Sequence, residues 1–390
     1  MATDSTLIGN WNYPTSIRFG AGRITELADA CTQLGMSNPL LVTDAGLASL
    51  PMTSDALTSL NNTGLNGALF SNVKPNPTGD NINAGVKAYT AGNHDGVIAF
   101  GGGSGLDAGK AIALMAGQTR PIWDFEDAGD NWQRVDPNGI APIVAVPTTA
   151  GTGSEVGRAS VIMDEAAQLK KIIFHPKMLP QIVIVDPALT TGLPATLTAA
   201  TGMDALSHNL EAYCSPGYHP MADGIALEAI RMIKEHLPTA YREPHNIKAR
   251  SQMLAASTMG ATAFQKGLGG MHALAHPLGA LYDAHHGMLN AILMPYVLSY
   301  NRPAIEERIV RLARYLDLDT YNFDSFLKWI VELRTELKIP NNLKDIGIND
   351  DKLDRVAAMA VEDPSAGGNP VLLTTEEYKG ILEKAVTGKY

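Results

Sequence analysis

The sequence predicts an α/β domain with a parallel sheet over residues 1–195, followed by an all-α domain over residues 196–390. Three observations support this division. The chain of 390 residues is long enough for two domains of ordinary size. In its first half, short apolar runs alternate with segments of helical periodicity, as in α/β proteins. In its second half the strand-like runs disappear and only helical patterns remain.

The expected strands of the first domain are apolar at consecutive positions and end at turn residues. Strands in the middle of a parallel sheet have this pattern, because helices cover both faces of the sheet. The run that ends in Phe100 stops at three glycines, and the run that ends in Val146 stops at a Pro-Thr-Thr segment. The strands expected on this basis are 39–43, 96–100, 143–146 and 182–185.

The expected helices of the second domain carry apolar residues at helical spacing. The segment 190–202 between the domains is rich in Thr, Gly and Pro, and we expect it to form a hinge. The helices expected from periodicity are 203–214, 221–237, 247–264, 304–316, 323–337 and 375–386.

Composition argues against several classes of protein. A net charge of -10 and the lack of a Lys/Arg run in the sequence argue against a nucleic-acid partner. Cys31 and Cys214 are too few for a disulfide framework and favour a reducing compartment. The sequence has neither a signal-peptide pattern at its start nor a run of about 18 apolar residues for a membrane span. We therefore expect a cytoplasmic protein with no membrane partner.

A glycine-rich turn follows the expected strand 96–100, within the segment GVIAFGGGSGLDAGK. Glycines let a ligand approach the backbone, and free N–H groups at a helix start favour an anion such as phosphate. Ser104 is a candidate cap for that helix. Gly103, Gly105 and Ala108 form a loose match to the dinucleotide-binding fingerprint. Taken alone, the turn is equally compatible with an ordinary strand-to-helix connection.

A second polar loop, VPTTAGTGSE (146–155), follows another expected strand. Its N–H and hydroxyl groups suit a pyrophosphate or a ribose. Two such loops at strand carboxyl ends favour a nucleotide lying across one edge of the sheet. Asp44 also ends a strand, where a carboxylate accepts hydrogen bonds from ribose hydroxyls and repels the 2′-phosphate of NADP. The alternative is an ordinary turn aspartate ahead of Gly46, and Asp44 precedes the glycines instead of following them as the fingerprint requires.

Four of the ten histidines lie within GGMHALAHPLGALYDAHHGM (269–288), which suggests a metal site. His272 and His276 are four residues apart and would share one face of a helix. Pro277 predicts a kink or a helix end directly after them. His286 is expected in a turn.

Asp204 and His208 have the same spacing on another expected helix. One carboxylate and three imidazoles suit a tetrahedral site for a divalent metal, with room for a substrate oxygen. The alternative for this pair is a local hydrogen bond. Burying so many titratable groups without a metal or partners would be costly, which favours the metal site. Spacing alone leaves open which of the histidines bind.

The motifs GGGSGLDAGK, PTTAGTGSE, DALSHNLEAY and HALAHPLGALYDAHHG resemble those of the iron-containing (group III) alcohol dehydrogenases. The resemblance extends from IRFGAG (17–22) to GGNP (367–370). It implies the dehydroquinate synthase-like fold of that family. In this fold an N-terminal dinucleotide-binding α/β domain and a C-terminal all-α metal-binding domain enclose the active site in a cleft.

The resemblance also implies roles for individual residues. His276 falls on a histidine that lies near the nicotinamide without holding the metal, and His285 matches no ligand. Gly109 stands where the family usually has alanine, which is expected to loosen that helix. The implied metal ligands are Asp204, His208, His272 and His286. The implied cofactor-binding residues are Asp44, Gly101, Gly102, Gly103, Ser104, Asp107, Lys110, Thr148, Thr149 and Thr152. The expected cofactors are NAD and Fe(II), with Zn(II) as an alternative metal.

The implied activity is interconversion of primary alcohols and aldehydes by hydride transfer, with a metal acting as Lewis acid. Arg158 follows the second polar loop, where the family commonly has a substrate-pocket residue. A guanidinium there would bind a carboxylate and favour a hydroxy acid or semialdehyde, such as 4-hydroxybutyrate or succinic semialdehyde. The alternative for Arg158 is an ion pair with Glu155 or Asp164.

Three other functions compete with this one. A zinc glycerol dehydrogenase would use a similar layout. A lyase resembling dehydroquinate synthase would need more lysines and arginines around its acidic, phosphorylated substrate than these segments have. A non-catalytic metal- or nucleotide-binding protein would not reduce NAD with any alcohol. We also expect a homodimer or higher homo-oligomer, and the resemblance implies that an edge strand within residues 5–20 pairs across the interface.

Overall fold

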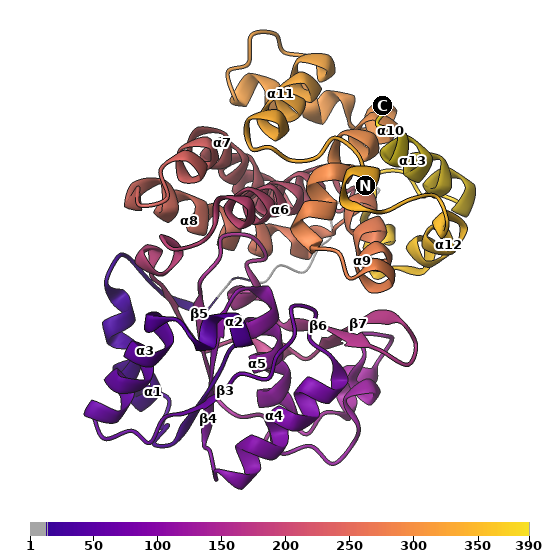
Figure 1. Ribbon diagram of the computed structural model, residues 1–390. Coiled ribbons are helices and arrows are strands. Elements are labelled where there is room, and N and C mark those ends of the chain that lie inside the picture. Colours follow the sequence, from indigo (N-terminus) through magenta and orange to yellow (C-terminus); the bar gives the residue numbers. More distant parts are fainter. Residues whose placement is uncertain (1–12, 14, 390) are drawn as a thin grey trace, which may run out of the picture. The chain divides into compact units, whose positions relative to one another are not determined.

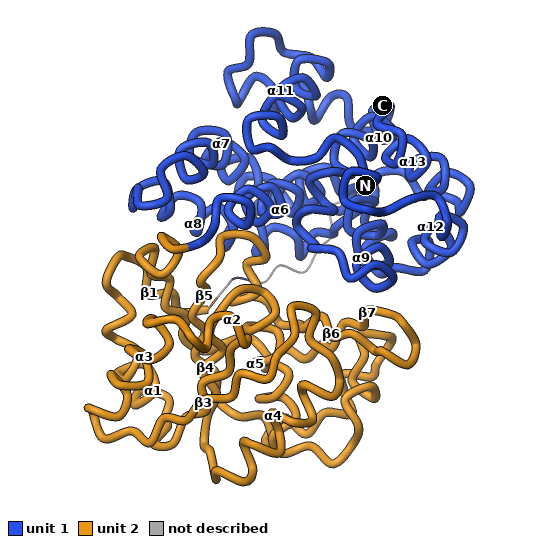
Figure 2. The backbone as a smooth tube through the Cα atoms, viewed as in Figure 1, with its two compact units in different colours: residues 1–13, 193–390 blue, residues 14–192 orange. Residues whose placement is uncertain are grey.

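The computed structural model of the protein describes Tyr13 and residues 15–389, which form two compact units (Figure 1, Figure 2). The first unit is Pro14–Gly192, and the second contains Leu193–Tyr390. The first is built on a parallel sheet and the second on helices, which confirms the expected fold class.

The first unit contains a six-stranded sheet in the order β1-β8-β5-β4-β2-β3, with every neighbouring pair parallel. All residues of β2, β4, β5 and β8 are buried, so the four strands expected from consecutive apolar residues are confirmed as interior strands. The strands are β1 (Ser16–Phe19), β2 (Pro39–Val42), β3 (Ala68–Phe70), β4 (Gly96–Gly101), β5 (Ile143–Pro147) and β8 (Ile182–Val185).

Two edge strands complete the sheet. The sequence pattern missed β3, which has three residues and is only partly buried. β1 falls within the strand expected at residues 5–20, while residues 5–12 and 14 of that strand lie outside the described residues. Partly buried edge strands lack the continuous apolar run that identifies interior ones.

Helices cover both faces of the sheet. Leu27 of α1 and Leu60 of α3 pack in one core with Leu41, Ile98 and other strand residues that point to the same face. α5 lies on the opposite face, against Ala99 of β4. The helices of this unit are α1 (Leu27–Gln33), α2 (Ala45–Ala48), α3 (Pro51–Asn62), α4 (Gly79–Ala91) and α5 (Gly103–Met115).

Gly109 allows α5 to approach the sheet closely. A Cβ atom on Gly109 would lie 2.6 Å from the Cβ of Ala99 and 2.9 Å from its Cα, so a larger residue would push the helix outward. α5 continues without interruption through this position. The glycine therefore does not loosen the helix, and instead it permits a closer helix–strand contact than alanine would.

An antiparallel hairpin, which the sequence pattern missed, extends the first unit beyond the sheet. It consists of β6 (Ala159–Asp164) and β7 (Leu169–Phe174). Alternate residues of β6 are buried, so the strand has no continuous apolar run of the kind that identified the interior strands. The hairpin packs against α5.

The second unit is arranged around α6, which is buried on all sides over residues 203–214. In Figure 1, α6 lies between the α7–α8 pair and α10, and it packs against all three. The described part of this unit contains no strand. Its helices are α6 (Ala195–Cys214), α7 (Pro220–Arg242), α8 (Ile247–Ala263), α9 (Gly270–Tyr282), α10 (His286–Tyr315), α11 (Phe323–Glu336), α12 (Leu353–Glu362) and α13 (Thr375–Thr387).

No described helix has the length and apolar character needed to cross a bilayer. Short 3-10 helices occur in both units. The 3-10 helices are η1 (Arg23–Glu26), η2 (Ile122–Phe125), η3 (Asn131–Arg134), η4 (Ser154–Val156), η5 (Pro176–Met178), η6 (Pro187–Thr190), η7 (Phe264–Lys266), η8 (Lys344–Ile346) and η9 (Pro364–Gly368).

Three local expectations were wholly or partly wrong at element boundaries. The expected hinge 190–202 contains the boundary between the two units, at Gly192 and Leu193, but it is helical from Ala195 onward. The helix end expected after Pro277 does not occur, because α9 continues to Tyr282 and packs against α10 and α12, while the alternative of a kink stays a prediction. His286 is the first residue of α10 and does not lie in a turn.

Candidate active site

Three helices of the second unit bring one carboxylate and three imidazoles together. Asp204 and His208 come from α6 at the expected helical spacing, His272 comes from α9, and His286 comes from the first turn of α10. One ligand atom from each residue lies within 4.8 Å of those of the other three. Asp204, His208 and His272 are buried, and His286 is partly exposed. This is the donor set that the sequence suggested for a divalent metal.

Close packing of α10 against α6 fixes part of this arrangement. A Cβ atom on Gly287 would lie 2.5 Å from the carbonyl oxygen of Ala200 and 3.1 Å from the Cβ of Asp204. Only glycine permits this approach. It places the neighbouring His286 with its Nε2 atom 3.6 Å from Oδ1 of Asp204.

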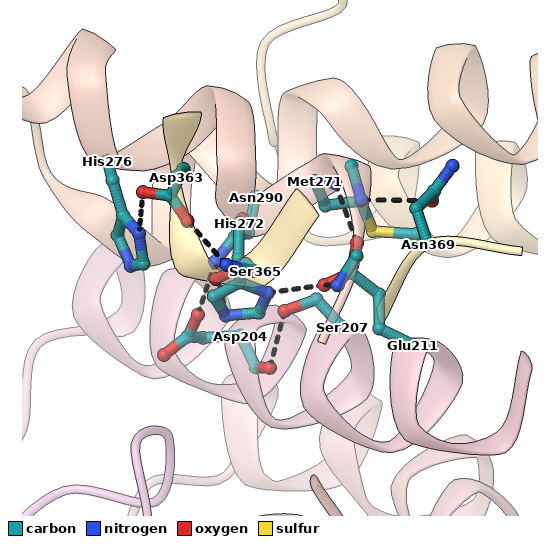
Figure 3. Close-up of polar contacts among 12 residues, drawn as sticks. Asp204, Ser207, Glu211, Met271, His272, His276, Asn290, Asp363, Ser365 and Asn369 are labelled. Carbon is teal, nitrogen blue, oxygen red and sulfur yellow. Dashed lines mark hydrogen bonds and ion pairs between the residues drawn. The ribbon is translucent and has the colours of Figure 1, made fainter. Parts of the chain in front are cut away.

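Glu211 fixes the imidazole of His272, and the sequence analysis did not identify this residue. Figure 3 shows its carboxylate facing the start of α9, where Oε2 lies 2.6 Å from Nδ1 of His272. Burial lowers the pKa of His272, but the nearby Glu211 carboxylate outweighs that effect, so the pKa is raised overall. A signal was available in the sequence, because Glu211 lies on the same helix face as Asp204 and His208.

Asn290 is a second buried neighbour that the sequence analysis missed. Its Nδ2 atom lies 2.8 Å from Oδ1 of Asp204 and 3.2 Å from Nε2 of both His272 and His286. An amide nitrogen only donates and carries two protons for these three contacts, so the arrangement favours unprotonated Nε2 atoms directed at the shared centre. Its Oδ1 atom is buried and has no hydrogen-bond partner. Unprotonated imidazole nitrogens beside a carboxylate are the donor chemistry that fits a divalent ion.

His276 lies beside the four-residue group but is not part of it. Its ring stacks on that of His286, with centroids 5.4 Å apart, and its Nδ1 atom lies 2.8 Å from Oδ2 of Asp363. Burial raises the pKa of Asp363, but the contacts with His276 and with Ser365 at the start of η9 lower it overall. His285 caps α10 by accepting a hydrogen bond from the N–H of Met288, which gives it a structural contact.

The glycine turn and the second polar loop meet at the carboxyl ends of β4 and β5. The N–H of Thr148 donates to the carbonyl of Gly101, which has a φ of +140°. A Cβ on Gly102 would lie 3.2 Å from Thr149, and one on Gly103 would lie 2.6 Å from Thr152. The absence of side chains thus lets the two loops pack together and leaves N–H groups at the start of α5.

Ser104 and Asp107, which were predicted to bind the cofactor, form hydrogen bonds with other protein groups. The hydroxyl of Ser104 donates to the carbonyl of Pro75, and Gly102 occupies the N-cap position of α5 where Ser104 was expected. Asp107 accepts hydrogen bonds from Ser154 and from the N–H of Val161. These contacts attach α5 to its neighbours.

Lys110 is buried, and its ammonium donates to the carbonyl of Ala159 and lies 3.3 Å from Oδ1 of Asp107. Burial lowers the pKa of Lys110. The contact attaches α5 to β6, and a cofactor contact of this lysine stays a prediction.

Asp44 lies at the carboxyl end of β2, next to β4 in the sheet. Its Oδ1 atom accepts hydrogen bonds from the N–H groups of Gly46 and Leu47 at the start of α2. Its Oδ2 atom has no hydrogen-bond partner among the described residues. Asp44 therefore caps a short helix and keeps one oxygen available at the same sheet edge as the glycine turn.

Arg158 does not form the ion pair that we considered as an alternative. Among the described residues it bonds to neither Glu155 nor Asp164, and Asp164 pairs instead with Lys171 at 3.2 Å. The guanidinium of Arg158 lies over the ring of Phe174, 5.6 Å from its centroid. It is half-buried and forms no salt bridge among the described residues, but it lies near Asp127, where it lowers the pKa of that carboxyl against a larger raising effect of burial.

Comparison with known proteins covers almost the whole chain. A family model described as iron-containing alcohol dehydrogenase matches residues 14–187, and one described as the C-terminal part of the Fe-containing alcohol dehydrogenase family matches residues 198–386. The chain is 37% identical over 385 residues to a 4-hydroxybutyrate dehydrogenase of Cupriavidus necator, which covers 96% of this chain and 99% of that protein.

Solved structures agree with the family models. A crystal structure of a 1,3-propanediol oxidoreductase superposes with a TM-score of 0.91 at 35% identity, covering 97% of this chain and 100% of that one. A sulfoacetaldehyde reductase of Bifidobacterium kashiwanohense, solved in complex with NAD+, superposes with a TM-score of 0.87 at 28% identity, covering 97% and 99%. The chain is therefore an oxidoreductase that belongs to the iron-containing alcohol dehydrogenase family.

Proposed function

We propose that Asp204, His208, His272 and His286 hold the divalent metal of an NAD-linked alcohol dehydrogenase acting on primary alcohols and aldehydes. One observation carries this proposal, which is the convergence of four ligand atoms within 4.8 Å of one another. The hydrogen bonds of Asn290 and Glu211 add support, because they favour unprotonated Nε2 atoms that face the common centre. The donor set accepts Fe(II), which the family name suggests, and Zn(II) as an alternative.

The residues of the chain have separate tasks in this reaction. When bound, the ion supplies Lewis-acid chemistry to an alcohol or carbonyl oxygen, and NAD supplies the acceptor or donor of hydride. The N–H groups of the glycine turn bind the pyrophosphate, and Asp44 accepts hydrogen bonds from the ribose. His276 accepts or returns a proton at Nε2, because its Nδ1 atom is occupied by Asp363.

Elemental analysis with an activity assay tests the metal site. We expect wild type to bind one divalent ion per chain and to form NADH from alcohols, and we expect His272→Ala to lose both properties. His285→Asn is the matched control, because asparagine retains the cap of α10 while the adjacent imidazole is removed. Full metal content and normal turnover in His272→Ala would overturn the assignment.

A second candidate is oxidation of a hydroxy acid such as 4-hydroxybutyrate. The half-buried guanidinium of Arg158 forms no salt bridge among the described residues, although the Asp127 carboxylate is near it, and the Cupriavidus necator relative is a 4-hydroxybutyrate dehydrogenase. If Arg158 binds the substrate carboxylate, Arg158→Ala raises KM for 4-hydroxybutyrate about 10-fold or more and leaves KM for butanol unchanged. An unchanged KM for 4-hydroxybutyrate in Arg158→Ala would contradict binding of the substrate carboxylate by Arg158. Simple primary alcohols would then remain as the proposed substrates.

We also propose that the enzyme is a cytoplasmic homodimer or higher homo-oligomer. Cys31 and Cys214 are buried free thiols, which suits a reducing compartment. Among the described residues β1 lies at the sheet edge with a partner on one side only, which leaves its other side available to a second copy. Light scattering should give at least twice the chain mass of 41.5 kDa. A monomer mass at working concentration would contradict the oligomer.

A further inference from the structure

Glu211 lies on the same face of α6 as Asp204 and His208, yet it contributes no ligand atom to the four-residue group. Its side chain is 5% exposed, and its carboxylate faces the start of α9 (Figure 3). There Oε2 accepts a hydrogen bond from the N–H of Gly269 at 2.8 Å and Oε1 accepts one from the N–H of Met271 at 2.6 Å. The third contact, at 2.6 Å, joins Oε2 to Nδ1 of His272.

The first turn of α9 depends on side chains from elsewhere for its cap. The N-cap residue is Gly269, which has no side chain to satisfy the free N–H groups. Glu211 accepts from two of these groups, and Oδ1 of Asn369 accepts from Gly270 at 3.0 Å. A Cβ on Gly269 would lie 3.0 Å from Asn369 and 3.1 Å from Glu211, so a capping side chain would crowd both residues.

The same carboxylate determines which nitrogen of His272 carries a proton. Oε2 of Glu211 already accepts from the N–H of Gly269, and a carboxylate is an acceptor only, so Nδ1 of His272 must be the donor. The proton therefore lies on Nδ1 and the lone pair on Nε2. Nε2 is also the atom that lies 3.2 Å from Nδ2 of Asn290, which in turn contacts Asp204 and His286.

We propose that Glu211 is a positioning residue for the metal centre. It fixes the tautomer and the ring orientation of His272, so that α6 supplies two ligands and also aligns the third. This inference rests on the proposed metal site. Carboxylates that accept the second N–H of a ligating histidine orient the ring and strengthen metal binding, and their loss costs about 10–100-fold in affinity.

The isosteric change Glu211→Gln separates orientation from volume. A glutamine amide fills the same space, and its oxygen still accepts from one backbone N–H group. With its NH2 group toward His272, the amide cannot accept the Nδ1 proton, and with its NH2 group toward Met271 it sets two donors against each other at the start of α9. Either orientation disturbs the contacts that hold the His272 ring with its Nε2 lone pair toward the metal centre. We expect the affinity for Co(II) to fall about 10–100-fold.

Asn369→Ala is the matched control, because it removes the other remote cap of α9 and does not touch the imidazole. The experiment titrates four metal-free proteins with Co(II) against a competing chelator. They are the wild type and the variants Glu211→Gln, Glu211→Asp and Asn369→Ala. Ligand-field spectra of the Co(II) proteins report the coordination, and thermal unfolding of the metal-free proteins reports any loss of fold. We expect Glu211→Asp to retain part of the affinity, and Asn369→Ala to bind Co(II) as wild type does even where it unfolds earlier.

Two results would overturn the inference and leave the metal site intact. One is wild-type Co(II) affinity and spectrum in Glu211→Gln, and the other is an equal loss of affinity in Asn369→Ala, which would reduce Glu211 to a helix cap. Failure of wild type itself to bind Co(II) would overturn the proposed site together with this inference.

Discussion

At the scale of single residues, two histidines of the candidate active site use the same device. His272 and His276 each direct Nδ1 at a buried carboxylate, Glu211 or Asp363, at 2.6 Å and 2.8 Å respectively. Each carboxylate stabilises one tautomer and leaves Nε2 free to act. The proposed tasks differ because His272 belongs to the four-residue group and His276 does not.

His276 and Asp363 should therefore act as a unit. We expect His276→Ala to lower kcat about 100-fold, because general acid–base groups contribute roughly that much or more. Asp363→Asn should lower kcat by a smaller factor, since the amide favours the other tautomer, and the double variant should be no worse than His276→Ala. Metal content should stay at the wild-type level in all three variants. Strictly additive losses would contradict a shared role.

Asp44 should decide the choice of cofactor. Asp44→Ser keeps a side-chain oxygen that caps α2 but removes the negative charge at the sheet edge. We expect kcat/KM with NADP to rise at least about 10-fold, because repulsion of the 2′-phosphate is lost, and kcat/KM with NAD to fall. Steady-state kinetics with both cofactors measures the change. An unaltered preference would mean that Asp44 is only a helix cap.

At the scale of elements, the site depends on how closely helices approach. Gly287 lets α10 lie against the backbone of α6 at Ala200, and Gly109 does the same for α5 and β4. Such close contacts outweigh the low intrinsic preference of glycine for a helix. Packing of α9 against α10 and α12 likewise accompanies the continuation of α9 through Pro277.

Gly287→Ala should move His286 away from Asp204. The added Cβ would lie 2.5 Å from the Ala200 carbonyl oxygen, so α10 must shift. We expect the free energy of unfolding to fall by about 1–3 kcal/mol, as in overpacked cores, together with a lower Co(II) affinity. The control is Gly380→Ala in α13, where no atom lies within 4 Å of the new Cβ. That change should be neutral or stabilise by about 0.5–1 kcal/mol. Urea unfolding and Co(II) titration of both variants test the contrast.

At the scale of the whole molecule, metal binding should be coupled to the stability of the helical unit. The four-residue group buries a carboxylate and imidazoles whose preferred partner is a cation. An ion that binds only the folded state stabilises it by about 2.7 kcal/mol at 100 times Kd. We expect chelation to lower the unfolding midpoint and Zn(II) to restore it in wild type but not in His272→Ala. An unfolding midpoint that does not change when divalent ions are removed or added would contradict this coupling.

Much of the fold and part of the site could be predicted from local patterns. Interior strands such as β4 and β5 have continuous apolar runs, and α6 has helical periodicity with Asp204 and His208 one turn apart. These features depend on neighbours in the sequence. The partly buried edge strand β3 and the hairpin β6–β7 have no continuous apolar run. Their sequences therefore do not identify them as strands, and tertiary contacts stabilise them instead.

The sequence by itself determined the alternation of strands and helices, the glycine turn after β4, and the spacing of the candidate ligands within each helix. Tertiary structure alone decided which imidazoles share a centre and which carboxylates orient them. Glu211 and His272 are 61 residues apart, and His276 and Asp363 are 87 apart. No periodicity connects residues at such separations, because their contact follows from how α6, α9 and the segment at η9 pack together.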